Sequence, residues 1–349
     1  MKLINYEYDN IIDIASNERI PFVVTIELNT ICNLKCEHCY IPSHTNEGMD
    51  IETIKTLLNN LRELGTFELV FTGGEIFLRK DIYDILKYSR DLGFSIKLFT
   101  NVTLIDEEMA EKLSKLPISL ISTSIYSLTD EIHDSITHKK GSLQMALQGI
   151  ENIRKYNIPL EVKMIVMNKN INSIKSLEQF CKEKDIKFVA SPFVFPKSNG
   201  DISPINNRVN DKESLFTIVD SIDDISKFNP AVHDDNDYIC PNMRYSIGIE
   251  CNGNVNPCNA LFYSIGNIYN ESIKKIWDSE NLKAFQNMKF GDLKDCKGCA
   301  NKSFCIRCPG IAHSESGNYL KSYAFACSMA EVRHYKYKER EEEFLNENQ

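Results

Sequence analysis

Apolar, β-branched segments alternate with amphipathic stretches through the first 195 residues of this 349-residue chain. The apolar segments have the length of buried strands, and the amphipathic stretches repeat their apolar residues at helical spacing. Strands are expected near 22–28, 67–72, 95–100, 118–125, 160–167 and 187–194. Helices are expected near 50–64, 80–92, 106–115, 143–156 and 171–184. Six strands that alternate with helices favour a parallel sheet with right-handed crossovers. The predicted fold class is α/β, a partial (β/α)6 TIM-like barrel.

Residues that start and stop helices stand at the ends of these stretches. Asp50, Asp106 and Asn170 occupy N-cap positions, and Gly65 and Gly93 occupy positions just after a helix. A short polar side chain satisfies free backbone N–H groups at a helix start, and glycine adopts the left-handed conformation that ends a helix. These residues therefore support the predicted boundaries.

The pattern changes after residue 195. Prolines and glycines punctuate residues 196–239, which we interpret as a linker with one bridging helix near 212–226. Residues 240–333 are rich in cysteine and poor in apolar runs, with a single helix expected near 271–288. We therefore predict a barrel domain at 1–195, the linker, a small cysteine-rich C-terminal domain at 240–333 that needs metal to hold it together, and a charged helical tail at 334–349.

Composition narrows the class of protein. Hydrophobic residues make up 42% and charged residues 26% of the chain, as in a soluble globular protein. The net charge of −9 argues against a nucleic-acid partner. The N-terminus is polar, without the features of a signal peptide, and no run of eighteen apolar residues is long enough for a membrane span. We therefore expect a cytoplasmic protein whose clustered cysteines bind metal rather than pair in disulfides, while Cys181, the one of the twelve outside the clusters, packs in a helix.

Three cysteines lie on one loop directly after the first predicted strand, at Cys32, Cys36 and Cys39. Three thiolates on one loop can hold three corners of an iron–sulfur cube. Structural zinc sites normally use four ligands, although a zinc knuckle or a disulfide-bonded loop remains an alternative interpretation. A fourth iron corner without a cysteine ligand would be free to bind a substrate or cofactor.

The spacing C-x3-C-x2-C resembles that of the radical S-adenosylmethionine (SAM) enzymes. The resemblance implies that a [4Fe-4S] cluster on these thiols binds SAM and cleaves it reductively to a 5′-deoxyadenosyl radical. That radical would abstract a hydrogen atom from the substrate. The same resemblance implies a partial barrel, with the cluster loop at the carboxyl end of the first strand.

Further motifs follow the next strands. The resemblance implies that Gly73, Gly74 and Glu75 bind the SAM amino group, and that Asn101 and Ser124 face its carboxylate and ribose. The alternative interpretation of Asn101 and Ser124 is that they cap loops or face helices. The resemblance places His38 where the family usually has an aromatic residue that packs on the adenine, and it implies that the His38 backbone rather than its imidazole makes this contact.

The C-terminal cysteines resemble those of the SPASM extension, which holds auxiliary [4Fe-4S] clusters. Two clusters are implied, the first with Cys240, Cys258, Cys308 and Cys251, and the second with Cys296, Cys299, Cys305 and Cys327. Two departures from the family pattern bear on this division. Two residues rather than three separate Cys305 from Cys308, and Cys251 is an unusual addition. A zinc ribbon is the alternative, because C-x2-C pairs also suit zinc.

The resemblance implies an oxidoreductase that modifies a peptide, by cross-linking, thioether formation or epimerisation. A separate leader-binding protein and a reductant such as flavodoxin or ferredoxin are implied partners. Sulfatase-maturing relatives carry an acid after the cysteine that matches Cys258, whereas this chain has Asn259, which cannot act as a base. A radical SAM dehydrogenase of a small alcohol and a non-catalytic iron–sulfur or zinc scaffold are the alternatives. No catalytic side chain is assigned.

Overall fold

The computed structural model describes residues 2–223, 230–231 and 233–347. Six helix-linked parallel strands come first, and a shorter region with three more strands follows. The strands are β1 Val23–Glu27, β2 Glu68–Thr72, β3 Ser95–Phe99, β4 Leu120–Ser124, β5 Leu160–Ile165, β6 Lys187–Ser191, β7 Ser246–Ile249, β8 Asn254–Asn256 and β9 Gly266–Asn267. The helices are α1 Lys2–Glu18, α2 Ile51–Glu63, α3 Ile82–Asp91, α4 Glu107–Ser114, α5 Asp130–Thr137, α6 Ser142–Lys155, α7 Ile174–Glu183, α8 Lys212–Ile222, α9 Ile273–Trp277, α10 Glu280–Gln286, α11 Pro309–Ser316 and α12 Ala324–Glu347.

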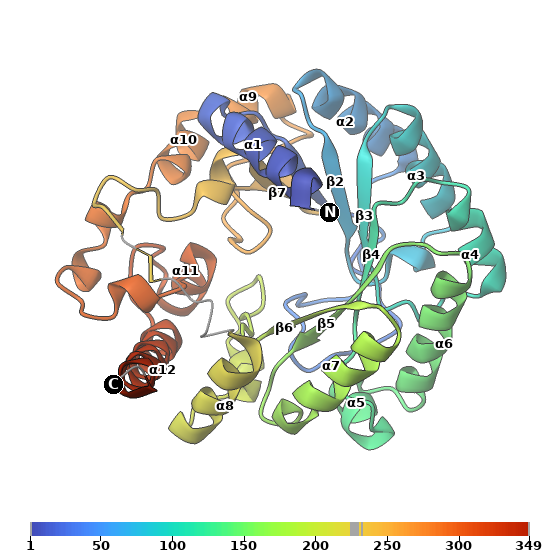
Figure 1. Ribbon diagram of the computed structural model, residues 1–349. Helices are drawn as coiled ribbons and strands as arrows, with labels where there is room; N and C mark the ends of the chain where they lie inside the picture. The colour runs from blue at the N-terminus through green and yellow to red at the C-terminus, as the bar shows by residue number, and fades with distance from the viewer. Residues whose placement is uncertain (1, 224–229, 232, 348–349) are drawn as a thin grey trace.

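The strands form one open sheet, in the order β6-β5-β4-β3-β2-β1-β7-β8-β9. Strands β1 to β6 pair in parallel, each with the next in sequence, which confirms the predicted partial barrel. Strand β7 pairs in parallel with β1, on the edge of β1 that does not pair with β2. Strand β8 then pairs antiparallel with β7, and β9 pairs antiparallel with β8. The C-terminal region therefore extends the sheet of the barrel (Figure 1).

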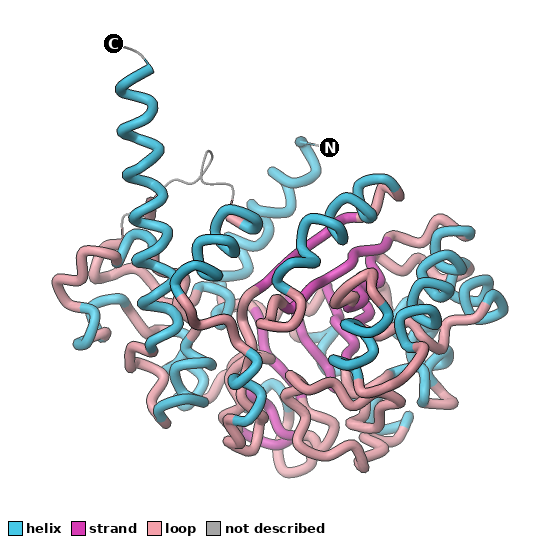
Figure 2. The backbone as a smooth tube through the Cα atoms, turned by 90° about the horizontal axis from the view of Figure 1, so that it is seen from below, coloured by secondary structure: helices cyan, strands magenta, loops and turns pink. Residues whose placement is uncertain are grey.

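The two faces of the barrel sheet differ in chemistry. Helices surround the strands on the outside (Figure 2), where alternate strand residues such as Ile96 and Leu98 are fully buried. The residues between them point inward. On this inner face Lys97 pairs with Glu68 at 2.9 Å, and Lys187 pairs with Glu161 at 2.6 Å. Ion pairs therefore occupy part of the barrel interior below the carboxyl ends of the strands.

Most predicted helix ends are confirmed. The Asp50 and Asp106 carboxylates accept hydrogen bonds of 2.8 Å from the backbone N–H groups of Thr53 and Met109. Gly65 and Gly93 follow α2 and α3 with φ of +90° and +84°, a conformation that favours glycine. Asn170 makes no capping bond. Its carboxamide oxygen accepts from the Met167 N–H at 2.7 Å instead, and α7 begins four residues later.

The second half of the chain has more regular structure than its sequence predicts. The expected single helix near 271–288 is two helices, α9 and α10, because the Ser279 hydroxyl accepts from the Leu282 N–H and starts a new helix. Strands β7 to β9 and helix α11 were not expected, and neither was α5 in the first half of the chain. The bridging helix α8 ends at Ile222, and the last residues of its expected range, 224–226, lie outside the described residues.

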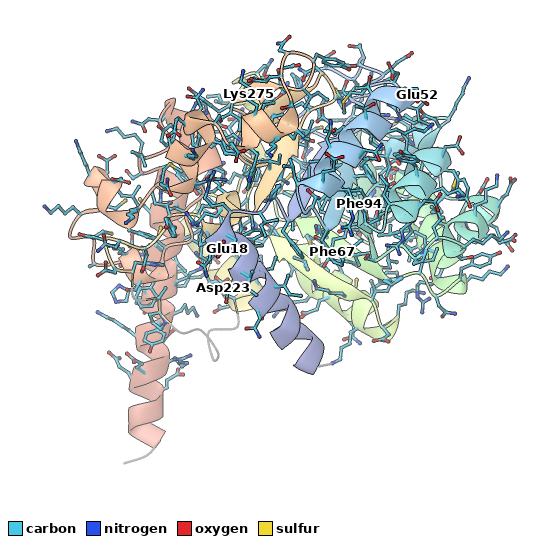
Figure 3. The ribbon with its side chains drawn as sticks, turned by 90° about the horizontal axis from the view of Figure 1, so that it is seen from above. Glu18, Glu52, Phe67, Phe94, Asp223 and Lys275 are labelled. Carbon is cyan, nitrogen blue, oxygen red and sulfur yellow. The ribbon has the colours of Figure 1, made fainter. Side chains whose placement is uncertain are left out.

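Helix α12 is longer than the expected tail and begins at Ala324. Its Arg333 side chain is 3% exposed and donates a 2.7 Å hydrogen bond to Asp223, which lies at the end of α8 (Figure 3). The far end of α12 projects beyond the rest of the molecule (Figures 2 and 3). Residues 348 and 349 of the expected tail lie outside the described residues. None of the described helices is long and apolar enough to cross a membrane.

Candidate active site

A cavity of about 440 Å³ opens at the carboxyl ends of the barrel strands. Parallel α/β sheets place their active sites at this edge. The cavity brings together eight of the nine residues that sequence analysis assigns to the first cluster and to SAM. They are Cys32, Cys36, His38, Cys39, Gly73, Gly74, Asn101 and Ser124.

The cysteine loop is held in place by its backbone. The Lys35 and Glu37 N–H groups donate 3.0 Å hydrogen bonds to carbonyls at the end of α5, those of Thr137 and Ile136. The Cys39 N–H donates to the Cys36 carbonyl at 3.0 Å. All twelve cysteines of the chain are described, and none forms a disulfide. The loop therefore presents three unpaired thiols to one side of the cavity.

The three thiols share a nonpolar, crowded environment. Burial, followed by the neighbouring Cys39 and Cys32 thiols, raises the pKa of Cys36 to about 12. Burial also raises the pKa of Cys39 to about 11 and that of Cys32 above its usual value. Three such thiols stay protonated at neutral pH unless a cationic group stabilises the thiolates. Iron in a sulfur-ligated cluster supplies that positive charge.

The glycine pair after β2 packs against the start of the cysteine loop. A Cβ atom on Gly74 would lie 2.2 Å from the Ile31 carbonyl oxygen, and one on Gly73 would lie 2.5 Å from the Asn29 carbonyl oxygen. The absence of side chains allows two backbone hydrogen bonds, from Gly74 N to Asn29 O at 2.9 Å and from Glu75 N to Ile31 O at 2.8 Å. The glycines therefore fix the position of the loop as well as lining the cavity.

Glu75 does not line the cavity, unlike the other residues predicted to bind SAM. Its buried carboxylate accepts hydrogen bonds from Thr100 Oγ1 at 2.7 Å, Asn101 N at 2.8 Å and Phe77 N at 3.0 Å. Burial nevertheless raises the pKa of Glu75. The carboxylate therefore joins the end of β2 to the end of β3, and its contacts with the protein use both oxygens.

His38 and Tyr126 meet on the wall of the cavity. The His38 Nε2 atom lies 3.2 Å from the Tyr126 hydroxyl, and burial lowers the pKa of His38 to about 4. The imidazole is therefore neutral at physiological pH. Its Nδ1 atom is buried and has no hydrogen-bond partner among the described residues.

Sequence analysis missed the part of the cavity formed by β5, β6 and the loop after Cys258. Lys163, Phe193, Phe195, Asn259 and Phe262 line this part. The alternation of inward and outward residues along β5 could have identified Lys163, two residues from inward-facing Glu161. Nothing in the local sequence indicates that a loop almost 100 residues after β5 lies opposite that strand.

The C-terminal thiols fall into two groups. The first group is Cys240, Cys258 and Cys308. Burial and the neighbouring Cys308 raise the pKa of Cys240, and burial with both neighbours contributes to a pKa of about 12 for Cys258. The second group is Cys296, Cys299, Cys305 and Cys327. Burial raises the pKa values of Cys296, Cys305 and Cys327, and neighbouring thiols of the group raise each of them further.

Cys251 lies apart from both groups. Its thiol and backbone N–H contact Glu27 at the end of β1, with Cys251 N 3.4 Å from Glu27 Oε1. The Tyr40 hydroxyl donates to the other oxygen of Glu27 at 3.1 Å. Burial, then the Glu27 carboxylate, raises the pKa of Cys251 to about 12. Cys251 therefore contacts Glu27 and does not contribute to the mutual pKa effects of Cys240, Cys258 and Cys308, and its predicted place in the first cluster stays a prediction.

Among the described residues, no three His, Cys, Asp or Glu side chains converge closely enough to hold a metal ion. The thiol groups above are therefore defined by the loops that carry them and by their mutual electrostatic effects.

Comparison with known proteins identifies the family. The family model for the radical SAM superfamily matches residues 26–181, and the model for the SPASM iron–sulfur cluster-binding domain matches residues 240–300. The subtilosin biosynthesis protein AlbA of Bacillus subtilis is 30% identical over 310 residues, covering 84% of this chain and 68% of AlbA. The chain belongs to the radical SAM superfamily. The radical SAM domain binds a [4Fe-4S] cluster and SAM, which confirms these predicted cofactors.

Other radical SAM relatives differ in their named activities. The AdoMet-dependent heme synthase of Methanosarcina barkeri is 26% identical over 335 residues, covering 86% of this chain and 95% of the synthase. Streptococcus suis SuiB, solved with the precursor peptide SuiA, superposes with a TM-score of 0.71 at 16% identity, over 88% of this chain and 76% of SuiB. The enzyme anSMEcpe, solved with AdoMet and the Cp18Cys peptide, gives 0.68 at 18% identity, over 93% and 99%. These superpositions confirm the fold.

The Glu75 contacts predict a stability effect. Glu75→Gln places an amide NH2 group against backbone or hydroxyl donors, so we expect the free energy of unfolding to fall by about 1–3 kcal/mol. Urea unfolding followed by circular dichroism measures the change. The exposed Glu111→Gln variant is the control, with an expected change below about 0.5 kcal/mol. If Glu75→Gln had the same free energy of unfolding as the unsubstituted chain, the three hydrogen bonds to the carboxylate would not contribute to stability.

Proposed function

We propose that this chain is a radical SAM/SPASM enzyme that abstracts a hydrogen atom from a peptide substrate. One observation carries the proposal. The Cys32, Cys36 and Cys39 thiols border the same cavity as Gly73, Gly74, Asn101 and Ser124, at the carboxyl ends of four neighbouring strands. A cluster and SAM would therefore meet in one cavity.

The donor set fits an iron–sulfur cluster. Cys32, Cys36 and Cys39 offer three sulfur ligands, and the described residues that line the cavity include no fourth cysteine. The Leu34 N–H lies 3.4 Å from the Cys32 sulfur and the Asn101 carboxamide nitrogen 3.9 Å from it. Such donors stabilise a thiolate. We propose that these three cysteines hold the cluster and leave one iron open to SAM.

The cavity also offers groups for SAM. We propose that His38, Gly73, Gly74, Asn101 and Ser124 bind it, with the buried, unpartnered Nδ1 atom of His38 as one hydrogen-bonding group. Glu75 would act indirectly, because its carboxylate positions the Asn101 backbone. When bound at these residues, a reduced cluster would supply the electron that cleaves SAM to methionine and a 5′-deoxyadenosyl radical, and that radical would take a hydrogen atom from the substrate.

The two C-terminal thiol groups suit two auxiliary clusters. We propose that Cys296, Cys299, Cys305 and Cys327 hold one cluster, and that Cys240, Cys258 and Cys308 hold the other without Cys251. A domain division at 1–195, 196–239 and 240–333 belongs to this proposal. These clusters would accept an electron from the substrate radical or help to anchor the peptide.

A peptide substrate is supported by relatives and by the cavity. AlbA is named for the biosynthesis of subtilosin, a bacteriocin, and the SuiB and anSMEcpe structures contain peptides. Asn259 lines the cavity. Its carboxamide cannot accept a proton as a carboxylate would. This favours modifications that need no carboxylate base at that position.

A tetrapyrrole is the second candidate substrate. The AdoMet-dependent heme synthase of Methanosarcina barkeri supports it, because that relative matches over 86% of this chain and 95% of its own length. The aromatic residues that line the cavity are compatible with either substrate.

Formation of 5′-deoxyadenosine tests the proposed reaction class. The anaerobically reconstituted chain, given SAM and dithionite, is expected to form 5′-deoxyadenosine and methionine, measured by liquid chromatography. Cys36→Ala should lower the rate by at least about 100-fold, because the reducing cluster loses a ligand. Absence of 5′-deoxyadenosine from the unsubstituted, iron-loaded chain would instead support a non-catalytic iron–sulfur scaffold.

The substrate class is tested separately. The chain is co-expressed with short peptides encoded beside its gene, and mass spectrometry shows whether a peptide loses hydrogen. The purified protein is also titrated with iron coproporphyrin III, and the visible absorbance shows whether it binds. Modification of a peptide without tetrapyrrole binding supports our proposal, and the reverse result supports the second candidate.

The position of Cys251 predicts the iron content of two variants. Cys251→Ala should retain all iron, since its thiol contacts Glu27 rather than other thiols. Cys258→Ala is the matched variant within the first group and should lose the iron of one cluster, about four atoms. Iron analysis and electron paramagnetic resonance (EPR) measure both. Loss of the same cluster from the Cys251→Ala variant would contradict this prediction and show that Cys251 is a ligand of that cluster.

A further inference from the structure

The cavity has two halves, and the proposed cofactors account for one of them. The cysteine loop and the ends of β2, β3 and β4 form the half proposed for the cluster and SAM. Strands β5 and β6 and the residues after them form the other half, with Lys163, Ile165, Phe193 and Phe195 among its lining residues. Phe262, on the loop after Cys258, lies at the boundary, because its ring stacks on Tyr40 next to Cys39 with the ring centroids 5.3 Å apart. Neither the proposed cluster nor SAM occupies this second half.

Lys163 brings a positive charge to the boundary between the two halves, because its backbone belongs to β5 and its ammonium lies over the Phe99 ring at the end of β3. It is the only lysine or arginine among the described residues that line the cavity, and no described Asp or Glu lines it. Its side chain is 34% exposed, and β5 places it in register with Ser124 of β4. A cationic group thus lies beside the proposed SAM half, on a rigid strand.

The protein neutralises this charge only weakly. Lys163 Nζ lies 3.5 Å from the nearer oxygen of Glu161, whereas Lys187 Nζ lies 2.6 Å from the other oxygen and Ser122 Oγ donates to the nearer oxygen at 3.0 Å. The Lys163 ammonium also lies 3.8 Å from the centre of the Phe99 ring. Two lysines thus share one carboxylate, which leaves one positive charge in excess at the cavity.

Partial burial makes that excess charge unfavourable when the cavity holds no anion. Burial is the main cause of a lowered pKa for Lys163. The Phe99 ring offsets part of the cost through a cation–π contact. A carboxylate that reached Nζ would form a charge-assisted hydrogen bond in a partly dehydrated site. Phe193, Phe195 and Phe262 would surround an apolar group attached to that carboxylate.

We infer that Lys163 recognises a carboxylate of the substrate that lies next to a bulky apolar group. The inference rests on the proposed function, because it takes the first half of the cavity to hold SAM. In a peptide, the carboxylate would belong to an aspartate or glutamate side chain or to the C-terminus, next to an aromatic or aliphatic residue.

The test compares two probes that differ only in charge. N-acetylphenylalanine and N-acetylphenylalanine amide are titrated into the reconstituted, SAM-saturated chain, and ligand-observed NMR measures their dissociation constants. We expect the acid to bind at least about fivefold more tightly than the amide. Lys163→Met should abolish this preference, and Lys163→Arg should retain it. Lys184→Met, which removes a lysine of similar exposure (31%) outside the cavity, is the control and should retain it.

Equal binding of the two probes, no binding of the acid at up to about 10 mM, or an unchanged preference in Lys163→Met would overturn the inference. SAM affinity in Lys163→Met is measured alongside and should stay within about twofold of the unsubstituted chain. A loss of about tenfold or more would assign the carboxylate to SAM and overturn its assignment to the substrate. These experiments measure binding rather than turnover. A negative result therefore overturns the role of Lys163 separately from the proposed reaction, which is tested by 5′-deoxyadenosine formation.

Discussion

The site depends on a close backbone contact between the first two strand ends. Gly73 and Gly74 let the backbone after β2 lie against residues 29–31, which lead directly into the cysteine loop. Two hydrogen bonds, from Gly74 N to Asn29 O and from Glu75 N to Ile31 O, fix this arrangement. A side chain at either glycine would push the loop away, so the thiols owe their position to two residues that provide no side chain.

Two carboxylates, of buried Glu75 and of half-buried Glu27, extend this arrangement to the rest of the molecule. Glu75 connects the end of β2 with Thr100 and Asn101 after β3. Glu27, at the end of β1, holds Tyr40 beside the cysteine loop and Cys251 at the end of β7. The C-terminal region is thus coupled to the cluster loop both through the β1–β7 pairing and through one glutamate. The loop after Cys258 lines the same cavity as the cysteine loop, and its Phe262 ring stacks on Tyr40.

The repeating part of the fold was predictable, because its signals are local. Alternating strand and helix patterns, with caps such as Asp50 and Asp106, located all six barrel strands and most of their helices. The C-terminal elements were missed because β7 and β8 are short and are held by pairing with β1 and with each other. The break between α9 and α10 depends on one serine cap. The role of Glu75 and the separation of Cys251 depend on contacts between residues distant in sequence, which spacing within a motif does not reveal.

The central claim is that the Cys32, Cys36 and Cys39 thiols hold a cluster with one iron open to SAM. EPR of the dithionite-reduced, anaerobically reconstituted chain, recorded with and without SAM, tests it most directly. The account predicts that SAM shifts the g-values of one cluster and that Cys36→Ala lacks this shift. Signals that SAM leaves unchanged in the fully iron-loaded chain, or zinc bound at these three thiols, would contradict it.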